Sequence, residues 1–114
     1  MYVPDTVWSV LEVDEMAERY ETSAAPVYPR DLISLGVQGM VQATYIVDTT
    51  GLVDTASFEV VSSDDLRFTE SVREAIAHMR FRPAKRGGKT VRQLVEQKFH
   101  FRINPPRGSG NRIG

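Results

Sequence analysis

The sequence predicts an α+β fold, in which a small antiparallel three-stranded sheet is covered on one face by one main helix. Three observations predict this fold. An alternating strand leads through an Asp/Gly turn into a second strand, an amphipathic helix follows, and a last alternating strand completes the order hairpin, helix, strand. The length of 114 residues fits one domain, and the hydrophobic fraction of 41% is typical of globular proteins.

The N-terminal region is predicted to hold a short helix and a candidate extra strand. Residues 6–13 are apolar and β-prone, whereas residues 12–25 are acidic and rich in small side chains, as in an irregular arm. A short helix is predicted over residues 29–35, because Pro29 suits the first helical position and Gly36 suits a left-handed C-cap. The apolar face of this helix would consist of Leu32, Ile33 and Leu35.

The central hairpin has the clearest pattern. Residues 37–47 alternate between apolar and more polar side chains, which predicts a half-buried strand. Residues 48–51 follow as the turn, with Gly51 in the left-handed position of a type I turn with a bulge. The return strand is predicted over residues 52–61, with Phe58 and Val60 on one face.

The main helix is predicted over residues 65–79, after cap residues at Ser63, Asp64 and Asp65. One apolar stripe runs along it at helical spacing: Phe68, Val72, Ala75, Ile76 and Met79. Pro83 ends the element, because proline disfavours helix in the residue before it.

A Gly87-Gly88 turn precedes the last strand, which is predicted over residues 91–103. A right-handed crossover from the hairpin through the helix places this strand beside the first strand of the hairpin. The first hairpin strand is then central, and the last strand is an edge with unpaired N–H and C=O groups.

The charge is unevenly distributed along the chain. Residues 1–31 carry seven acids and two bases, whereas residues 80–114 carry ten bases and one acid. This asymmetry indicates either an anionic partner or an acidic arm that folds against the basic C-terminal strand. The chain has no cysteine, which excludes disulfides and thiolate sites. No signal peptide and no apolar run of the roughly 20 residues that span a bilayer are visible.

The sequence holds no motif that predicts catalysis, metal binding or cofactor binding. Gly88-Lys89-Thr90 looks like the end of a phosphate-binding loop, but Pro83 stands where that motif needs glycine, and the order of strand and helix is reversed. His78 and His100 lack a second ligand at metal-binding spacing and are predicted to be surface residues.

Two pairs of carboxylates could suggest an acid pair, but both have structural explanations. Asp48 and Asp54 flank the hairpin turn, and Asp64 and Asp65 begin the main helix, so turn formation and helix capping are predicted. The sequence therefore predicts that the protein is not an enzyme.

Nucleic-acid binding is an alternative for the basic last strand. Phe81, Phe99 and Phe101 lie among arginines and lysines, and aromatics on a sheet stack bases in some RNA-binding proteins. Phe99 and Phe101, however, share parity with Val91, Val95 and Ile103, which predicts a core position and no nucleic-acid partner.

Several segments together resemble the TonB C-terminal domain family. Tyr28-Pro29 is followed by G-V-Q-G-M-V from Gly36 and by V-D-T-T-G-L-V from Val47. The likeness continues with Ser62-Ser63, the main helix and R-F-R-P-A from Arg80, and it closes with F-H-F-R-I over residues 99–103. It predicts an N-terminal arm over residues 1–27, a TonB C-terminal-like domain over 28–104 and a flexible tail over 105–114.

The resemblance implies a periplasmic domain of an energy transducer, anchored to the inner membrane by a segment absent from this chain. Such a domain grips the TonB box, a short peptide of outer-membrane transporters, and transmits work from inner-membrane motor proteins through the missing upstream regions. No catalysis and no cofactor are implied.

In the family the TonB box pairs with the edge of the last strand, which agrees with the edge expected above. Carried over, the resemblance implies the following partner-binding residues: Gln97, Lys98, Phe99, His100, Phe101, Arg102, Ile103, Tyr28 and Pro29.

Two departures from the family pattern bear on receptor details. Met79 stands where the best-known members have tryptophan, and Ala25 stands where they have glutamine. Residues 6–13 could cover an edge or exchange between protomers, and the edge could instead pair in a homodimer. The alternative function is a TonB-like accessory or dimerisation domain of another membrane protein, such as a sensor or a peptidase.

Overall fold

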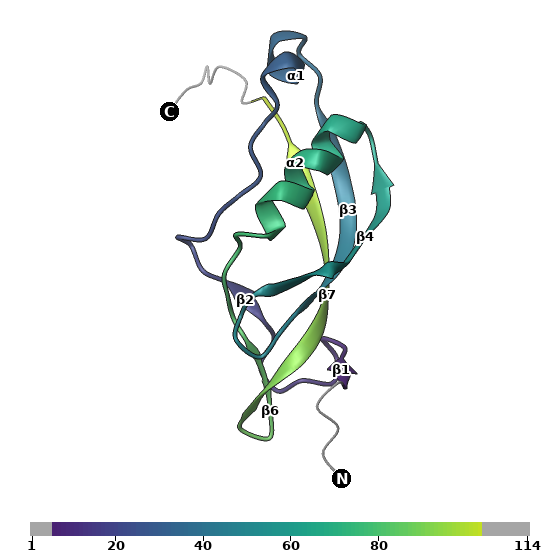
Figure 1. Ribbon diagram of the computed structural model, residues 1–114. Coiled ribbons are helices and arrows are strands. Elements are labelled where there is room, and N and C mark those ends of the chain that lie inside the picture. Colours follow the sequence, from purple (N-terminus) through teal and green to yellow (C-terminus); the bar gives the residue numbers. More distant parts are fainter. Residues whose placement is uncertain (1–5, 104–114) are drawn as a thin grey trace, which may run out of the picture.

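The computed structural model describes residues 6–103, and its sheet and main helix follow the predicted order (Figure 1). The elements are β1 (Val7–Trp8), β2 (Glu18–Arg19), α1 (Arg30–Ser34), β3 (Gly39–Val47), β4 (Val53–Ser63), α2 (Leu66–Ile76), β5 (Phe81–Arg82), β6 (Ala84–Arg86) and β7 (Lys89–Phe101). Figure 1 shows α2 lying across one face of the sheet that contains β4, β3 and β7. The predicted α+β class is confirmed.

The main sheet has the strand order β1-β7-β3-β4, with β6 paired to one end of β7. β3 is antiparallel to both of its neighbours, and its register with β7 runs from Gly39 opposite Phe101 to Val47 opposite Gln93. The expectation that the first hairpin strand is central is therefore confirmed. β7 begins and ends two residues earlier than predicted.

The candidate N-terminal strand is much shorter than residues 6–13. β1 pairs with β7 in parallel at Arg92 and Gln93 only. The chain then turns, because the Ser9 N–H donates to Glu12 Oε1 at 2.8 Å and the Glu12 N–H donates to the Ser9 carbonyl at 3.0 Å. The prediction of a strand up to Val13 was wrong, since this local turn satisfies the backbone in place of a sheet ladder.

The hairpin turn has the predicted chemistry. Asp48 Oδ1 accepts hydrogen bonds from the N–H groups of Thr50 and Leu52, and the Gly51 N–H donates to the Asp48 carbonyl. Gly51 has φ 89°, as its left-handed position requires. Partial burial raises the pKa of Asp48, but the hydrogen bonds from Thr50, Leu52 and Gly51 outweigh it and hold that pKa below its ordinary value.

The core lies between the sheet and α2. Four alternating residues of β3, namely Val41, Ala43, Tyr45 and Val47, are fully buried, and so are the predicted helix residues Phe68, Val72 and Met79. The helix ends at Ile76 and not at Met79, because the N–H groups of His78 and Met79 bond three residues back in tighter turns. Val60 is 39% exposed, so its predicted alignment with buried Phe58 was wrong; register shifts between β3 and β4 interrupt the alternation.

Helix α1 is shorter than predicted and is capped at its C-terminal end. Pro29 is the N-cap residue, with ψ 131°, and not the first helical residue. At the other end the Val37 N–H donates to the Leu32 carbonyl and the Gly36 N–H donates to the Ile33 carbonyl, which is the Schellman arrangement. Only Leu32 of the expected apolar face is buried, because one short turn presents too little surface to bury Ile33 and Leu35.

The acidic arm folds against the basic C-terminal part, as one of the two explanations of the charge asymmetry predicted. Glu18 of β2 forms an ion pair of 2.7 Å with Arg82 of β5, and Asp14 accepts the Gly87 N–H at 2.7 Å. The Ala17 N–H donates to the buried side chain of Gln93 at 2.7 Å. The arm thus includes ordered structure, and neither the β2–β5 pair nor β6 was anticipated, since strands of two or three residues have no recognisable period.

Candidate functional site: an open sheet edge on β7

The direction of the backbone groups in β3 determines which groups of β7 are free. The Met40 N–H donates to Asp64 Oδ2, and the Met40 carbonyl accepts the Asp64 N–H, so both backbone groups of Met40 face away from β7. The Ile46 N–H donates to Ser57 Oγ on β4 at 2.8 Å and faces the same way. Backbone groups alternate along an antiparallel strand, so Gly39, Val41, Ala43, Tyr45 and Val47 are the residues that bond to β7.

The register between β3 and β7 determines which residues of β7 alternate in the same way. Residues at odd positions from Gln93 to Phe101 bond to β3, since their partners on β3 face β7. The N–H and C=O groups of Leu94, Glu96, Lys98 and His100 therefore point away from β3. The Leu94 carbonyl accepts the Gln93 side-chain amide at 3.2 Å, and the Leu94 N–H faces β1, where Trp8 is paired with Gln93. The row available to a partner therefore consists of Glu96, Lys98 and His100. We call this row the β7 edge. An exposed row of this kind is a template for pairing with another extended chain.

A groove follows the C-terminal half of the β7 edge. It has a volume of about 310 Å³ and is lined by the consecutive residues 97–102 of the chain, together with Arg19, Ala25, Pro26 and Tyr28. The arm therefore forms the opposite wall and leaves room beside the strand. We call it the edge groove. Arg19, Ala25 and Pro26 were not among the predicted site residues, because only the folded arm brings them to β7.

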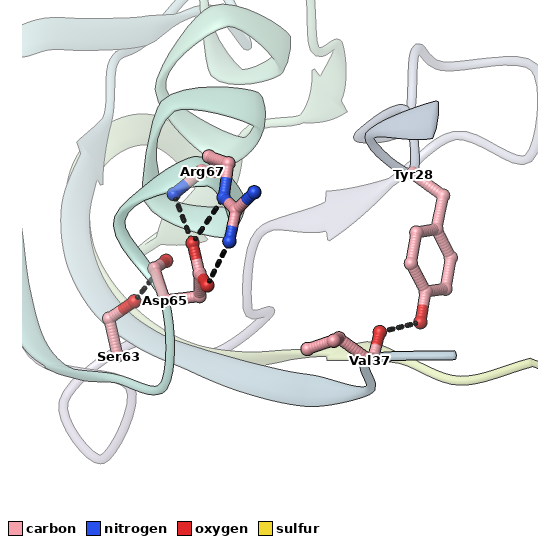
Figure 2. A network of polar contacts seen from close by, with 5 residues as sticks. All are labelled: Tyr28, Val37, Ser63, Asp65 and Arg67. Carbon is pink, nitrogen blue, oxygen red and sulfur yellow. Dashed lines mark hydrogen bonds and ion pairs between the residues drawn. The ribbon is translucent and has the colours of Figure 1, made fainter. Parts of the chain in front are cut away.

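Tyr28 holds this wall in place. Its ring lies edge-on to Phe68 and Phe101, with centroids 5.7 and 5.6 Å apart, and its hydroxyl donates to the Val37 carbonyl at 2.5 Å (Figure 2). Tyr28 is half-buried, so most of its ring is committed to packing. Pro29 does not line the edge groove and is the N-cap residue of α1.

The predicted β7 residues divide into two sets by parity. Phe99 and Phe101 are buried, and Gln97 accepts the Tyr45 hydroxyl at 2.6 Å, so these side chains face the core. Lys98, His100 and Arg102 are exposed, as expected. The Ile103 N–H is occupied, since it donates to Gln38 Oε1 at 2.8 Å. Glu96 extends the β7 edge beyond the predicted segment, and its parity with His100 is the sequence signal that could have identified it.

Burial controls the protonation of the tyrosine beneath the β7 edge. Desolvation raises the pKa of Tyr45 to about 12, and the positive charge of Arg19 opposes this rise. The hydroxyl therefore stays neutral and remains a donor to Gln97 at physiological pH. This hydrogen bond fixes the side chain at the centre of β7.

The alternatives considered from the sequence find no support in the folded structure. Within residues 6–103, no group of three or more His, Cys, Asp or Glu side chains could hold a metal ion. Phe81, Phe99 and Phe101 are at most 5% exposed, so they are not available to stack bases. In the same described part of the chain, neither helix is long and apolar enough to cross a membrane.

A small α+β domain with a groove beside a partly open strand of its sheet is the class of protein that the fold and the site define. The family model for the Gram-negative bacterial TonB protein C-terminal matches residues 24–103, and the chain belongs to this family. The family is one of energy-transducing proteins and not of enzymes.

Two relatives from Pseudomonas aeruginosa agree with this assignment. Protein TonB of that organism is 35% identical over 83 residues, which is 72% of this chain and 24% of that protein. The solution NMR structure of the P. aeruginosa TonB C-terminal domain has a TM-score of 0.67 and 30% identity, and the match covers 87% of this chain and 96% of that one. The chain thus spans about a quarter of the length of the curated relative.

Proposed function

We propose that this domain binds the TonB box of outer-membrane transporters as an extra strand on the β7 edge. The observation that carries the proposal is the outward direction of the backbone groups of Glu96, Lys98 and His100. β-augmentation needs a row of this kind, and main-chain pairing gives affinity with little demand on the peptide sequence. Such tolerance suits a domain that serves several receptors.

The surroundings of the β7 edge support the same conclusion. The edge groove lies beside residues 97–102, and its other wall is held by Tyr28. A peptide in this groove would pass the exposed side chains of Lys98, His100 and Arg102. Of the predicted binding residues, Gln97, Phe99 and Phe101 would position the strand from the core side, and Ile103 would end it.

The wider role follows from the family. We infer a periplasmic location, an anchor in the inner membrane outside this chain, and coupling to motor proteins through the upstream regions. The domain would then transmit force to a transporter through the paired strand. When two paired strands are pulled along their length, all of the hydrogen bonds between them bear the force together. This arrangement suits a mechanical role.

The experiment is an NMR titration of the ¹⁵N-labelled chain with a TonB-box peptide from a transporter of the same source. We expect a contiguous set of amide shifts from Leu94 to Ile103. His100→Pro should abolish binding, because proline removes an N–H that faces the peptide and leaves the ladder to β3 intact.

The matched control is His100→Ala, which keeps the N–H and should bind like the parent chain. Both variants must keep the dispersed spectrum of the folded domain. Absence of shifts at millimolar peptide, or equal binding by both variants, would contradict the proposal. The accessory-domain or homodimer alternative would then be favoured, with the β7 edge paired to a second copy.

A further inference from the structure

The structure assigns a second, apolar binding slot to the other half of the β7 edge, and we propose that it receives apolar side chains of the same extended peptide. This inference rests on the proposed function and deepens it, because it adds a requirement on the peptide. The slot has a volume of about 550 Å³, within the range of pockets that hold side chains and small ligands.

The lining of the apolar slot differs from that of the edge groove. Its β7 wall is the run of residues 93–97, and the opposite walls come from the arm, at residues 9–10 and 16–19. Val10, Met16 and Leu94 are 47%, 61% and 45% exposed there. Three large apolar side chains exposed around one slot, with buried Phe81 also lining it, indicate a surface that is completed by an apolar partner.

The slot and the edge groove are continuous along one strand. Gln97 and Arg19 line both, and the outward backbone groups of Glu96 lie in the slot. A peptide that pairs with His100 and Lys98 in the edge groove therefore enters the slot if its backbone hydrogen bonding continues along β7. This continuity commits the occupant to the bound peptide.

β1 closes the far end of the slot. It pairs with Arg92 and Gln93 on the side of β7 that faces away from β3, which is also the side of the β7 edge. The turn from Ser9 to Glu12 then carries the chain away from β7. The Arg86 guanidinium lies 4.2 Å from the centre of the Trp8 ring and helps to hold β1 there. The Leu94 carbonyl accepts the Gln93 side-chain amide, so the peptide can pair from His100 to Glu96 and no further.

The arm walls of the slot, at residues 9–10 and 16–19, lie outside the family match, which begins at residue 24. Gln93 seats this part of the arm, since its buried amide accepts the Ala17 N–H. The arm thereby adds a selection for apolar residues to the pairing along the β7 edge. Peptides that place polar residues in the slot would bind more weakly.

The test is a double-mutant cycle with the full 114-residue chain, with Kd measured by calorimetry. The probes are the TonB-box peptide and a set of its variants, each with one apolar residue replaced by serine. We expect one or two of these replacements to weaken binding about tenfold, and Leu94→Ser in the domain to do the same. The peptide replacement should cost little more once Leu94 is serine.

Leu66→Ser is the matched control, because Leu66 is 72% exposed at the start of α2 and lines neither the slot nor the edge groove. Met16→Ser is the second test variant if Leu94→Ser does not fold. Peptide-induced shifts at residues 97–103 with unchanged affinity for both slot variants would overturn the slot and leave the proposed function standing. No shifts anywhere would overturn both, and a concentration-dependent dimer that fills the slot without peptide would overturn the choice of occupant.

Discussion

At the scale of single residues, the site depends on side chains that fix β7 from its buried face. Tyr45 is fully buried and donates its hydroxyl to Gln97, so one hydrogen bond holds the centre of the strand. Tyr28 does the same for the edge groove by packing against Phe101. The backbone that would meet a peptide is therefore positioned by side-chain contacts that exist before the peptide binds.

Tyr45→Phe tests the first of these contacts. It leaves the Gln97 carbonyl without its donor in a largely buried place, so we expect the free energy of unfolding to fall by about 1–2 kcal/mol. Urea denaturation measures the loss, and Tyr20→Phe is the control, because Tyr20 is 43% exposed. An equal effect of both replacements would contradict a structural role for the Tyr45 hydroxyl.

The same residue predicts an alkaline limit to stability. Burial raises the pKa of Tyr45 from 10.0 to about 12, so the folded state binds the proton more tightly than the unfolded state. The contribution to stability is complete below pH 10 and is lost as the pH rises from 10 through 12. Between pH 10 and pH 12 the melting temperature should fall more steeply for the parent chain than for Tyr45→Phe. Parallel falls of the two melting temperatures would refute this role of Tyr45.

Gly51 is the residue of the hairpin turn that tolerates no side chain. Its φ is 89°, and an added Cβ would lie 2.1 Å from the Phe81 carbonyl oxygen. Gly51→Ala should therefore destabilise the domain by roughly 2–3 kcal/mol or prevent folding, since strain and steric overlap add. Thr50→Ala is the neighbouring control, and a similar melting temperature for the two variants would count against this view.

At the scale of elements, α2 covers the sheet and begins at a well-defined cap. Asp65 accepts the Arg67 N–H at 2.8 Å, and its carboxylate also contacts the Arg67 side chain, as Figure 2 shows. The side-chain hydrogen bond from Arg67 holds the pKa of Asp65 below its ordinary value. The ionised cap therefore stabilises the helix at neutral pH, and this stabilisation is lost in acid as the pH falls through the folded-state pKa.

Asp65→Ala removes the cap and should lower the melting temperature by roughly 4–8 °C at neutral pH. The difference from the parent chain should shrink toward low pH, where Asp65 is protonated in both states. Glu70→Ala on the exposed face of α2 is the control and should change little. A pH-independent difference would show that packing, and not the charged cap, is responsible.

At the scale of the whole molecule, the sheet order leaves the C-terminal part of β7 paired on one side only, because β1 and β6 pair with residues 89–93 and not beyond. Amides of Val95, Gln97 and Phe99 bond to β3, whereas those of Glu96, Lys98 and His100 face outward. Hydrogen exchange should therefore alternate along β7, slow at odd positions and fast at even ones. Bound peptide should slow the even positions, and uniform protection of the free domain would mean that the β7 edge is already paired.

Local patterns determined much of this architecture before any tertiary contact was known. Alternation in β3, the Asp48–Gly51 turn and the apolar stripe of α2 each predicted the observed element, because periodicity and turn chemistry act over a few residues. The chirality of the crossover placed β7 beside β3. The predictions that failed, such as the long N-terminal strand, concern places where a local turn competes with pairing.

The sequence by itself therefore determined the class of fold and the central strand. Its prediction that the last strand is an edge holds only for the C-terminal part of β7, because β1 and β6 pair with residues 89–93. Only the tertiary structure decided which backbone groups of β7 are free, because that depends on the register with β3 and on Met40 and Ile46 bonding toward β4. It also placed the arm beside the β7 edge, where contacts of Gln93 and Tyr28 hold it. Contacts between residues so far apart in the chain leave no periodic trace, since they form only when the sheet has brought their elements together.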